Sequence, residues 1–348
     1  MVLTEKEVTD IRDALSRSKN PLFIYDDDPD GLCSFLLLYR FFKKGKGRIL
    51  KTTSTLTEDW VRLVDESHTD CVVILDVPVV TQGFLDKMSV PVFWLDHHTP
   101  VDCSGVHYYN PRLNDPHAYF PTTRLSYDVV AENGVVKDSW IALVGCVADW
   151  HVPDFKDAFV AQYPDLFSSS VSEPEVALFG TPVGKLARIF SFILKGKTSE
   201  AFSCIKILTR IDSPYDILHG TSSQGRFILK RFEHVNEKYV ALLEQALAKP
   251  SRSKFFVFRY NEDQWSFSSE LSNELAYRFP RKVILVCREK NGSYKCSIRS
   301  RDKPILPVLQ KVLPEVGGSG GGHEYACGAV VPSDNFEVFL KKFRKEYG

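Results

Sequence analysis

Short, uninterrupted apolar runs that end in acidic residues constrain this chain more than any other feature. Pro21–Tyr25 leads into the cluster Asp26-Asp27-Asp28-Pro29-Asp30-Gly31, and the apolar run Leu32–Phe42 follows it. The first run has the length of a strand, whereas the second continues beyond that length and is typical of a helix. The sequence therefore predicts a buried strand, an acidic turn and a helix, which is where open α/β sheets bind ligands.

Two later apolar runs repeat this pattern. Cys71–Leu75 ends at Asp76, and Val90–Leu95 ends at Asp96-His97-His98. Apolar runs without polar alternation, separated by helical segments, predict a parallel sheet that is buried on both faces. Because the carboxyl ends of parallel strands meet at one edge, these acidic groups should converge there. The predicted helix Ser139–Val147 leads to a further acid, Asp149.

The composition is that of an ordinary globular protein. The chain has 348 residues, of which 44% are hydrophobic and 25% charged, and this length suits two domains. Lys+Arg and Asp+Glu are 44 each, so any contact with nucleic acid must be local. The eight cysteines form no C-x-x-C pair and predict free thiols in a reducing compartment. No stretch reaches transmembrane length, so we expect a cytoplasmic protein without membrane contact.

The hydrophobic pattern predicts an α/β protein in three parts. We expect a parallel-sheet N-terminal domain over 1–190, a helical connector over 191–250, and a smaller mixed-sheet α/β domain over 251–348. The pattern weakens between Tyr163 and Lys185, which predicts a loop-rich edge of the first domain. In the last part, Asn291-Gly292 predicts a hairpin turn.

Two further expectations concern the C-terminal end of the chain. Gly317–Gly322 predicts a glycine loop between a helix and a strand, with His323 directly after it. Its ordinary interpretation is a flexible linker, but glycine also lets backbone N–H groups approach an anion closely. The final helix should begin near Asp334, with Ser333 or Asp334 as its cap.

The acids and histidines suggest a metal site. Taken singly, each has an ordinary structural interpretation: a helix cap, a surface acid or the polar end of a strand. Their coincidence at successive strand ends favours a shared cation, since clustered carboxylates raise one another's pKa and need positive charge. Carboxylate with imidazole suits manganese, magnesium or iron better than zinc held by thiolates. A carboxylate between two ligand sets can bridge two ions, which clamp a phosphoryl group and acidify water.

These residues resemble the motifs of the DHH phosphoesterase superfamily. The four N-terminal motifs match Asp26–Gly31, Asp76, Asp96–His98 and Gly145–Asp149. The stretch Gly320–Gly328, GGGHEYACG, is similar to the G-G-G-H-x-x-A-x-G signature of that family's C-terminal substrate domain. The resemblance spans nearly the whole chain, with all five motifs in the family's order and spacing. It implies the parallel-sheet domain and the smaller domain expected above.

The resemblance also implies a role for each residue of the N-terminal motifs. His98 would face the substrate phosphate, and Asp96 would orient the histidine pair. Asp26 would be an extra ligand or a supporting group. Two divalent ions, manganese or alternatively magnesium, would be bound with Asp76 as the bridge. The implied metal ligands are Asp28, Asp30, Asp76, His97 and Asp149.

In the C-terminal domain the resemblance implies a phosphate subsite. Arg299 would hold a terminal phosphate in a bidentate manner beside the glycine-rich segment. The implied substrate-binding residues are Ser297, Arg299, Gly320, Gly321, Gly322 and His323. The chain departs from many relatives at Asp27, where they have His or Tyr. It also departs at Ile24, where the pyrophosphatase-like and small-nucleotide branches often place a ligand His. One metal site would then have fewer protein ligands, which disfavours hydrolysis of inorganic pyrophosphate.

The function expected from the resemblance is metal-dependent hydrolysis of short or single-stranded RNA or DNA. The RecJ-like and oligoribonuclease-like branches act from the 5′ end and release nucleoside monophosphates. One alternative is a phosphohydrolase acting on cyclic dinucleotides or 3′-phosphoadenosine phosphate. Another is an inactive RecJ-like scaffold that binds replication or repair proteins, with 162–220 as a partner surface. A homodimer is also compatible with the sequence.

Overall fold

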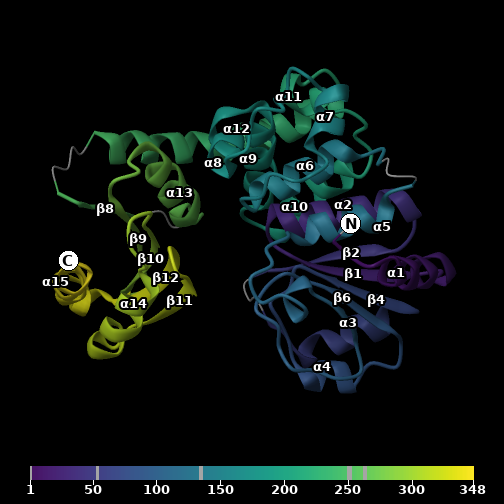
Figure 1. Cartoon of the computed structure of the whole chain (residues 1–348), viewed down its shortest axis with the longest axis horizontal. Helices are drawn as coiled ribbons and strands as arrows, with labels where there is room; N and C mark the ends of the chain where they lie inside the picture. Colours follow the sequence, from purple (N-terminus) through teal and green to yellow (C-terminus); the bar gives the residue numbers. More distant parts are fainter. Residues whose placement is uncertain (1, 52–54, 133–135, 249–252, 262–264) are drawn as a thin grey trace. The chain divides into compact units, whose positions relative to one another are not determined.

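The computed structural model describes the chain except for residues 1, 52–54, 133–135, 249–252 and 262–264. The chain divides into two compact units, Met1–Phe232 and Glu233–Gly348. The division falls inside α12 (Ser223–Leu247). The first unit contains a five-stranded parallel sheet and the second a five-stranded mixed sheet (Figure 1). The predicted fold class is therefore confirmed.

The parallel sheet of the N-terminal unit has the strand order β2-β1-β4-β6-β7. Its strands are β1 (Pro21–Asp26), β2 (Lys46–Leu50), β4 (Cys71–Leu75), β6 (Val92–Leu95) and β7 (His107–Tyr109). The chain passes from β1 to β2 on one side and later to β4 on the other, so the order reverses between β1 and β4. Such a switch point opens a crevice at the carboxyl ends of the strands.

Helices cover both faces of this sheet (Figure 1). On one face, α2 (Pro29–Phe42) and α5 (Thr122–Val130) pack side by side, and α6 (Ser139–Ala148) packs on both. On the other, α3 (Val61–Glu66) and α4 (Gln82–Asp86) cover a core that includes Trp94 and Phe84. A small two-stranded sheet, β3 (Thr55–Leu56) with β5 (Val79–Val80), adjoins this second face.

The close packing of α6 depends on Gly145. A Cβ atom at this position would lie 2.3 Å from Thr123 Oγ1 and 2.7 Å from Cys33 Cβ, closer than real contacts allow. A glycine therefore lets α6 approach α2 and α5 and fixes the place at which its C-terminal residue emerges. At the start of the chain, α1 (Glu5–Arg17) begins with a capping box formed by Thr4 and Glu7.

The segment from Tyr163 to Lys185 is more helical than predicted. It contains α8 (Pro174–Gly180) and the first turn of α9 (Pro182–Leu194). The loop prediction is confirmed for residues 163–173, which contain no helix or strand, and is wrong from Pro174 onward. There both prolines occupy a first helical turn, where no backbone donor is needed. Further helices of this unit are α7 (Lys156–Gln162), α10 (Thr198–Leu208) and α11 (Pro214–His219).

Among the described residues no single helix is both long and apolar enough to cross a membrane. Together α8 and α9 reach that length and composition, but they are bent by 78°. The eight cysteines are free in the structure, as the sequence predicts.

The mixed sheet of the C-terminal unit has the order β11-β12-β10-β9-β8. Its strands are β8 (Phe255–Tyr260), β9 (Val283–Lys290), β10 (Ser293–Arg299), β11 (Ser319–His323) and β12 (Ala326–Pro332). β8 runs parallel to β9, and the other pairs are antiparallel. Asn291 and Gly292 join β9 to β10 with φ values of 51° and 72°, which confirms the predicted hairpin.

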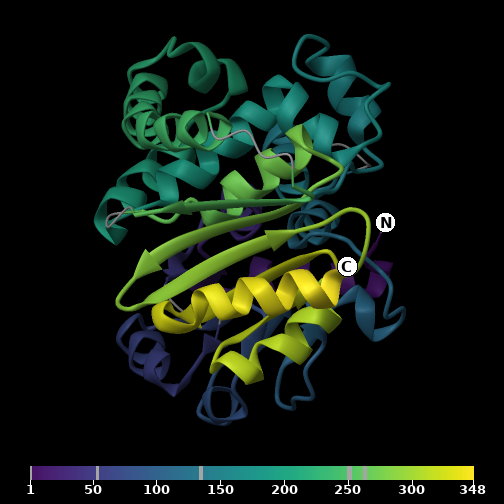
Figure 2. The ribbon, with the colours of Figure 1, turned by 90° about the vertical axis from the view of Figure 1, so that its left-hand side faces the viewer.

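Helices lie on both faces of the mixed sheet as well. α14 (Leu306–Val312) and α15 (Phe336–Tyr347) share a hydrophobic core with one face, and Figure 2 shows α15 running roughly along the direction of the strands. α13 (Ser268–Arg278) contacts β9 and β10.

Two details of the C-terminal end differ from the prediction. The glycine run is largely a strand, β11, because its backbone pairs with β12. The helix α15 begins at Phe336, after a 3-10 turn over Ser333–Asn335. Its N-cap is Asn335, which makes no side-chain capping bond, so neither Ser333 nor Asp334 is the cap.

Candidate metal centre

The acidic turn after β1 is compact because of Gly31. Asp26 is the last residue of β1, and Asp28 caps α2 by accepting a 2.9 Å hydrogen bond from Gly31 N. A Cβ atom at Gly31 would lie 2.8 Å from both N and O of Asp26. Only glycine permits this approach without displacement. The turn therefore holds the Asp26 and Asp28 side chains close together at the strand end.

Asp30 is buried, and the start of α5 fixes its carboxylate. Its two oxygens accept hydrogen bonds from Thr122 N at 2.8 Å and Thr123 N at 2.7 Å. The first N–H groups of a helix have no partner within the helix, so they bind an anion readily. The Thr123 hydroxyl donates to the Asp30 carbonyl at 3.0 Å. Asp30 is thus held by a segment distant in sequence.

Asp76 follows β4 with a strained backbone. Its φ is 61°, in the left-handed region that aspartate enters more readily than most residues but still at a cost of about 1–2 kcal/mol. Its backbone N–H donates to Leu95 O at 3.0 Å, and Thr122 Oγ1 donates to Asp76 Oδ1 at 3.3 Å. Strain of this kind concentrates at functional sites, where the surrounding contacts maintain it.

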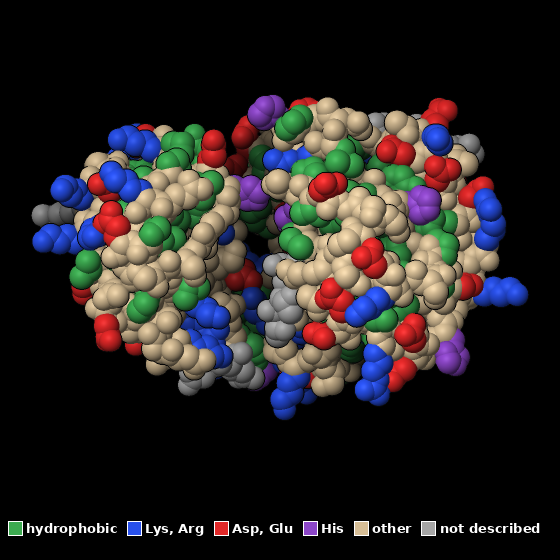
Figure 3. Space-filling model, turned by 90° about the horizontal axis from the view of Figure 1, so that it is seen from below, with side chains coloured by type: hydrophobic (Ala, Val, Ile, Leu, Met, Phe, Trp, Pro, Cys, Tyr) green, Lys and Arg blue, Asp and Glu red, His purple; other side chains and the backbone are tan. Residues whose placement is uncertain are grey.

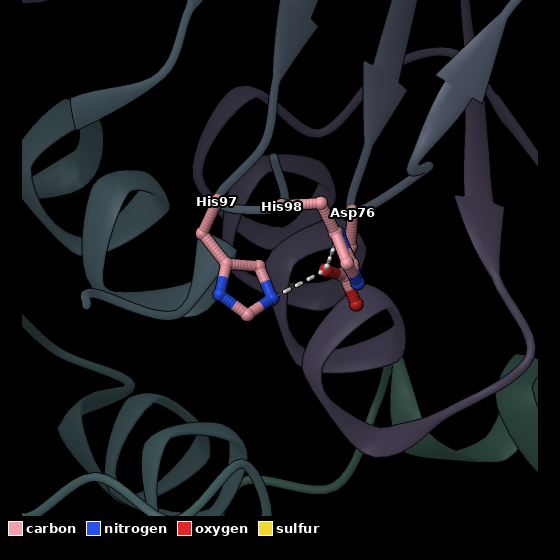
Figure 4. Close-up of side chains that lie close together, drawn as sticks. All are labelled: Asp76, His97 and His98. Carbon is pink, nitrogen blue, oxygen red and sulfur yellow. Dashed lines mark ion pairs between the residues drawn. The ribbon is translucent and has the colours of Figure 1, made fainter. Parts of the chain in front are cut away.

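His97 lies at the centre of the cluster. Its Nε2 atom is 3.2 Å from Asp76 Oδ1, 3.7 Å from Asp149 Oδ2 and 3.9 Å from Asp30 Oδ2. Figure 4 shows His97 and His98 both directed at the Asp76 carboxylate. These groups come from three strand ends and one helix end, as the parallel-sheet argument predicts.

The side chains form three overlapping groups whose ligand atoms all lie within 4.8 Å of one another. The groups are Asp30 with His97 and Asp149; Asp76 with His97 and His98; and Asp26 with Asp28 and Asp76. His97 links the first two groups and Asp76 links the last two. Such an arrangement can hold two divalent cations with Asp76 between them, so the donor set fits the implied metals.

Burial makes the cluster costly without a cation. Burial and neighbouring carboxylates, with Asp28 foremost, raise the pKa of Asp26 and that of Asp30 to about 7. Burial, and then the charge of Asp30 ahead of that of Asp28, raise the pKa of Asp76 and that of Asp149 well above the usual range. Either protons or cations must neutralise such a cluster. At neutral pH, divalent ions would relieve the repulsion that otherwise favours protonation.

Asp96 orients His98. This buried carboxylate contacts His98 Nδ1 at 2.8 Å and accepts from His98 N at 3.1 Å. Asn110 Nδ2 donates to Asp96 at 3.2 Å, and Tyr108 OH donates at 3.3 Å. Burial is the largest single influence on the pKa of His98 and lowers it, but the hydrogen bond to Asp96 and the charges of Asp96, Asp28 and Asp30 together raise the net pKa. The His98 side chain is 31% exposed, so its ring lies at the accessible side of the cluster.

Asp149 is held differently from the other acids. It is the C-cap of α6, where the helix dipole disfavours negative charge. The Tyr119 hydroxyl donates to its carboxylate and to its carbonyl, both at 2.9 Å. Asp27, by contrast, turns toward Lys51 Nζ at 3.0 Å and belongs to none of the three groups.

The predicted phosphate residues lie together on the mixed sheet. Arg299, Ala326 and His323 are opposite one another on β10, β12 and β11, and Ser297, Gly328 and Gly321 form the next row on the same face. A Cβ atom at Gly321 would meet nothing within 4 Å, and at Gly328 only Cys296 O at 4.0 Å. This face is therefore open where a ligand could approach the backbone.

Alternation along β11 gives its glycines different roles. Gly320 and Gly322 point away from the open face, and a Cβ there would lie 2.4 Å from Gly328 O and 2.6 Å from Ala326 O respectively. Packing therefore requires glycine at both positions, because neither has room for a side chain. Arg299 is anchored beside the open face by Asn273 Oδ1 at 2.6 Å and Ile298 O at 2.9 Å, and burial lowers its pKa to about 10.

Sequence reasoning missed several residues that support the cluster. Tyr119, Thr122, Thr123, Tyr108 and Asn110 all contact predicted site residues. The N–H groups at the start of α5 bind the Asp30 carboxylate, which lies about ninety residues earlier in the sequence, and no spacing signal pairs the two. No signal of spacing pointed to Tyr119, because its partner Asp149 is 30 residues away.

Comparison with known proteins supports the sequence motifs. Residues 253–348 match the model of the DHHA1 domain. No curated protein matches the chain. Among solved structures, RecJ from Thermus thermophilus with Mn²⁺ is 15% identical, with a TM-score of 0.66, and the match covers 99% of this chain. The chain spans only 55% of that RecJ.

Two further solved structures match nearly the whole of both chains. The pGpG-specific phosphodiesterase PggH from Vibrio cholerae is 12% identical with a TM-score of 0.54, and the match covers 94% of this chain and 98% of PggH. CDC45 from Entamoeba histolytica is 12% identical with a TM-score of 0.51, covering 99% of each chain. At these identities the likeness shows the fold. Residues 253–348 therefore belong to the DHHA1 domain family, and the chain as a whole has the fold of the RecJ and PggH structures.

Proposed function

We propose that the chain is a metal-dependent phosphodiesterase that hydrolyses short or single-stranded oligonucleotides to nucleoside monophosphates. The observation that carries this proposal is the overlap of the three ligand groups through His97 and Asp76. An ordinary surface cluster of acids would not be expected to contain a central imidazole or a buried carboxylate with a strained backbone. Two cation positions sharing one carboxylate are the arrangement that phosphoryl-transfer enzymes use.

Different residues of the chain would hold the two ions and contact the substrate. Asp30, His97 and Asp149 would hold one ion, Asp26 and Asp28 the other, and Asp76 both. Manganese is the leading candidate and magnesium the alternative, since the Thermus RecJ was solved with each. Bound ions would supply a water of lowered pKa and neutralise charge on the phosphodiester. His98, held by Asp96, would donate to the substrate phosphate from the accessible side.

The C-terminal unit would hold the substrate's end. Arg299 and the open face at Gly321 and Gly328 offer a guanidinium and exposed backbone to a terminal phosphate. The resemblance implies that Ser297 and His323 contact this phosphate too. By the resemblance, the phosphate held there would be the one at the 5′ end of the substrate. Replacing Arg299 with Ala should therefore raise KM more than it lowers kcat.

Short substrates are favoured over long duplexes. The net charge is zero, and on the face shown in Figure 3 acidic and basic side chains are interspersed. The composition therefore gives no broad positive electrostatic field, which the binding of long polyanions requires. PggH, which matches along nearly its full length, is described as specific for a dinucleotide. Dinucleotides are therefore the first substrates to test.

An inactive scaffold is the alternative that a specific observation favours. CDC45 shares the fold, and a scaffold role would make catalysis unnecessary. However, a scaffold has no reason to keep the complete, buried acid and histidine set described above.

Hydrolysis of a cyclic dinucleotide or of 3′-phosphoadenosine phosphate would use the same metal centre and differs only in the substrate.

The decisive experiment is a product analysis. Metal-free protein is supplied with Mn²⁺ or Mg²⁺ and incubated with di- to pentanucleotides, longer single-stranded DNA, cyclic dinucleotides and 3′-phosphoadenosine phosphate. We expect metal-dependent release of mononucleotides, fastest from the shortest linear substrates. Failure to hydrolyse any of these compounds would refute the proposed activity. Fast release from only the cyclic or the phosphoadenosine compound would favour the alternative substrates.

A further inference from the structure

Tyr119 is an aromatic residue at the edge of the metal centre. It lies in the segment between β7 and α5, and its ring is 5.6 Å from the His97 ring at an angle of 72°. The hydroxyl donates both to the carboxylate and to the carbonyl of Asp149. The ring is therefore placed directly beside the atoms that would hold one of the ions.

The two hydrogen bonds fix the ring although much of the residue is exposed. Tyr119 is 41% exposed, whereas Asp30 and Asp76 are each 1% exposed. The edge-to-face geometry with His97 leaves ring surface that is not stacked in the described part of the protein. A phenol whose hydroxyl is anchored loses little further conformational freedom when a ligand packs against it.

The chemistry around Tyr119 limits what would pack there. The neighbouring groups are carboxylates, suited to cations and, through cations, to a phosphate. In a nucleotide a single sugar joins the base to its phosphate. A phosphate at the metal groups therefore leaves its base within reach of the tyrosine ring. Aromatic stacking accepts any base, because every base has a π face.

We propose that the Tyr119 ring is the contact surface for the nucleobase adjacent to the scissile phosphate. This inference rests on the proposed function and adds a specificity-determining residue to it. The hydroxyl keeps the ring in place through Asp149, and the ring selects phosphodiesters that carry a base. Phosphodiesters of the same charge without a base would be bound more weakly.

The test separates the ring from the hydroxyl. Tyr119→Phe removes the hydrogen bonds to Asp149 and keeps the ring, whereas Tyr119→Leu removes both. The ratio of their KM values therefore reports the ring alone. Each variant is assayed at saturating Mn²⁺ on a 5′-phosphorylated diadenylate and on the same molecule with abasic residues. Phe227→Leu, which removes an exposed ring on α12, is the matched control.

We expect the ratio of KM for Tyr119→Leu over Tyr119→Phe to be on the order of tenfold for the diadenylate. For the abasic molecule it should be close to one, and Phe227→Leu should match the wild type on both. Mn²⁺ binding to each variant, measured by electron paramagnetic resonance of the free ion, shows whether the ions are retained. If Tyr119→Leu does not fold by circular dichroism, Tyr119→Gln takes its place.

Failure of this inference differs from failure of the proposed function. Equal KM ratios on the two molecules, with hydrolysis intact, would overturn the base contact and leave the phosphodiesterase standing. Binding of both molecules is measured in parallel by calorimetry. No hydrolysis, together with binding of the diadenylate that depends on the Tyr119 ring, would overturn the activity and support the contact. No hydrolysis and no ring-dependent binding would overturn both.

Discussion

Asp76 is the residue on which the candidate centre depends most. It is shared by two ligand groups, contacts His97 Nε2 at 3.2 Å and holds a left-handed backbone conformation. No other acid of the cluster combines burial, strain and a position between the groups in the described structure. Loss of its carboxylate should therefore affect both cation positions together.

The first prediction follows from this position. Asp76→Asn should weaken Mn²⁺ binding by more than the ~10–100-fold that loss of an outer hydrogen-bond partner causes. Calorimetric titration of the metal-free protein measures this directly, and hydrolysis should fall in parallel. Asp27→Asn is the matched control from the same acidic turn, because Asp27 pairs with Lys51 instead. Equal metal affinity of Asp76→Asn and Asp27→Asn would contradict the bridging role.

The second prediction concerns Asp96, which holds His98 by its side chain and backbone. Asp96→Asn should lower kcat about 10–100-fold, because an amide cannot accept both hydrogen bonds from His98 and fix the same tautomer. Metal affinity should change much less than in Asp76→Asn. Tyr108→Phe removes one weaker bond to Asp96, at 3.3 Å, and should cost less activity. A larger loss of metal binding than of kcat in Asp96→Asn would count against a positioning role.

At the scale of single residues, the sequence predicted the acids and histidines but not their supports. Strand ends in a parallel sheet converge by topology, so Asp30, Asp76 and His97 could be expected to meet. The hydrogen bonds of Tyr119 and Thr122 depend on loop conformations and distances that carry no periodic signal. Whether the predicted residues bind metal remains a prediction, because geometry shows only that they can.

At the scale of the element, β11 shows why glycine cannot be treated as one kind of residue. Its backbone pairs with β12, so a run that resembles a linker is an edge strand. The sequence predicted most strands and helices of both units from their apolar periodicity. It missed β11 and α8 because glycine and proline usually interrupt strands and helices. In β11 the glycines form a close-packed strand, and in α8 a proline begins the helix.

The third prediction uses neighbouring glycines of β11. Gly320→Ala should lower the melting temperature, because its Cβ would lie 2.4 Å from Gly328 O, and overpacking typically costs about 1–3 kcal/mol. Gly321→Ala should leave the melting temperature unchanged, because its Cβ meets nothing within 4 Å. If the open face binds substrate, Gly321→Ala should raise KM instead. Calorimetric melting and steady-state kinetics on both variants distinguish these effects, and an unchanged KM in Gly321→Ala would remove this face from the binding site.

At the scale of the whole molecule, the buried acids couple folding to pH and to metal. In the folded chain Asp26 and Asp30 each have a pKa of about 7, against an ordinary value near 4 in an unfolded chain. Between these values the folded state binds more protons than the unfolded state. The free energy of unfolding contributed by these groups is therefore greatest below about pH 4 and is lost as pH rises through 7.

The fourth prediction follows from that sign. Metal-free protein should melt at a higher temperature near pH 5.5 than near pH 8, where the acids must be charged and repel one another. Mn²⁺ should raise the melting temperature more near pH 8, since protons compete with the metal for the same oxygens. Differential scanning calorimetry with and without metal at both pH values measures this. A larger metal-induced shift at the lower pH would contradict it.

The reversal of strand order between β1 and β4 has a consequence for when the set of ligand residues is assembled. The switch point gathers ligands that span residues 26 to 149, so no short segment of the chain contains a working set. A growing polypeptide on the ribosome holds no complete centre until Asp149 has emerged and α6 has packed through Gly145. A complete set of ligand residues is thus a property of the finished N-terminal unit, and no shorter segment of it contains one.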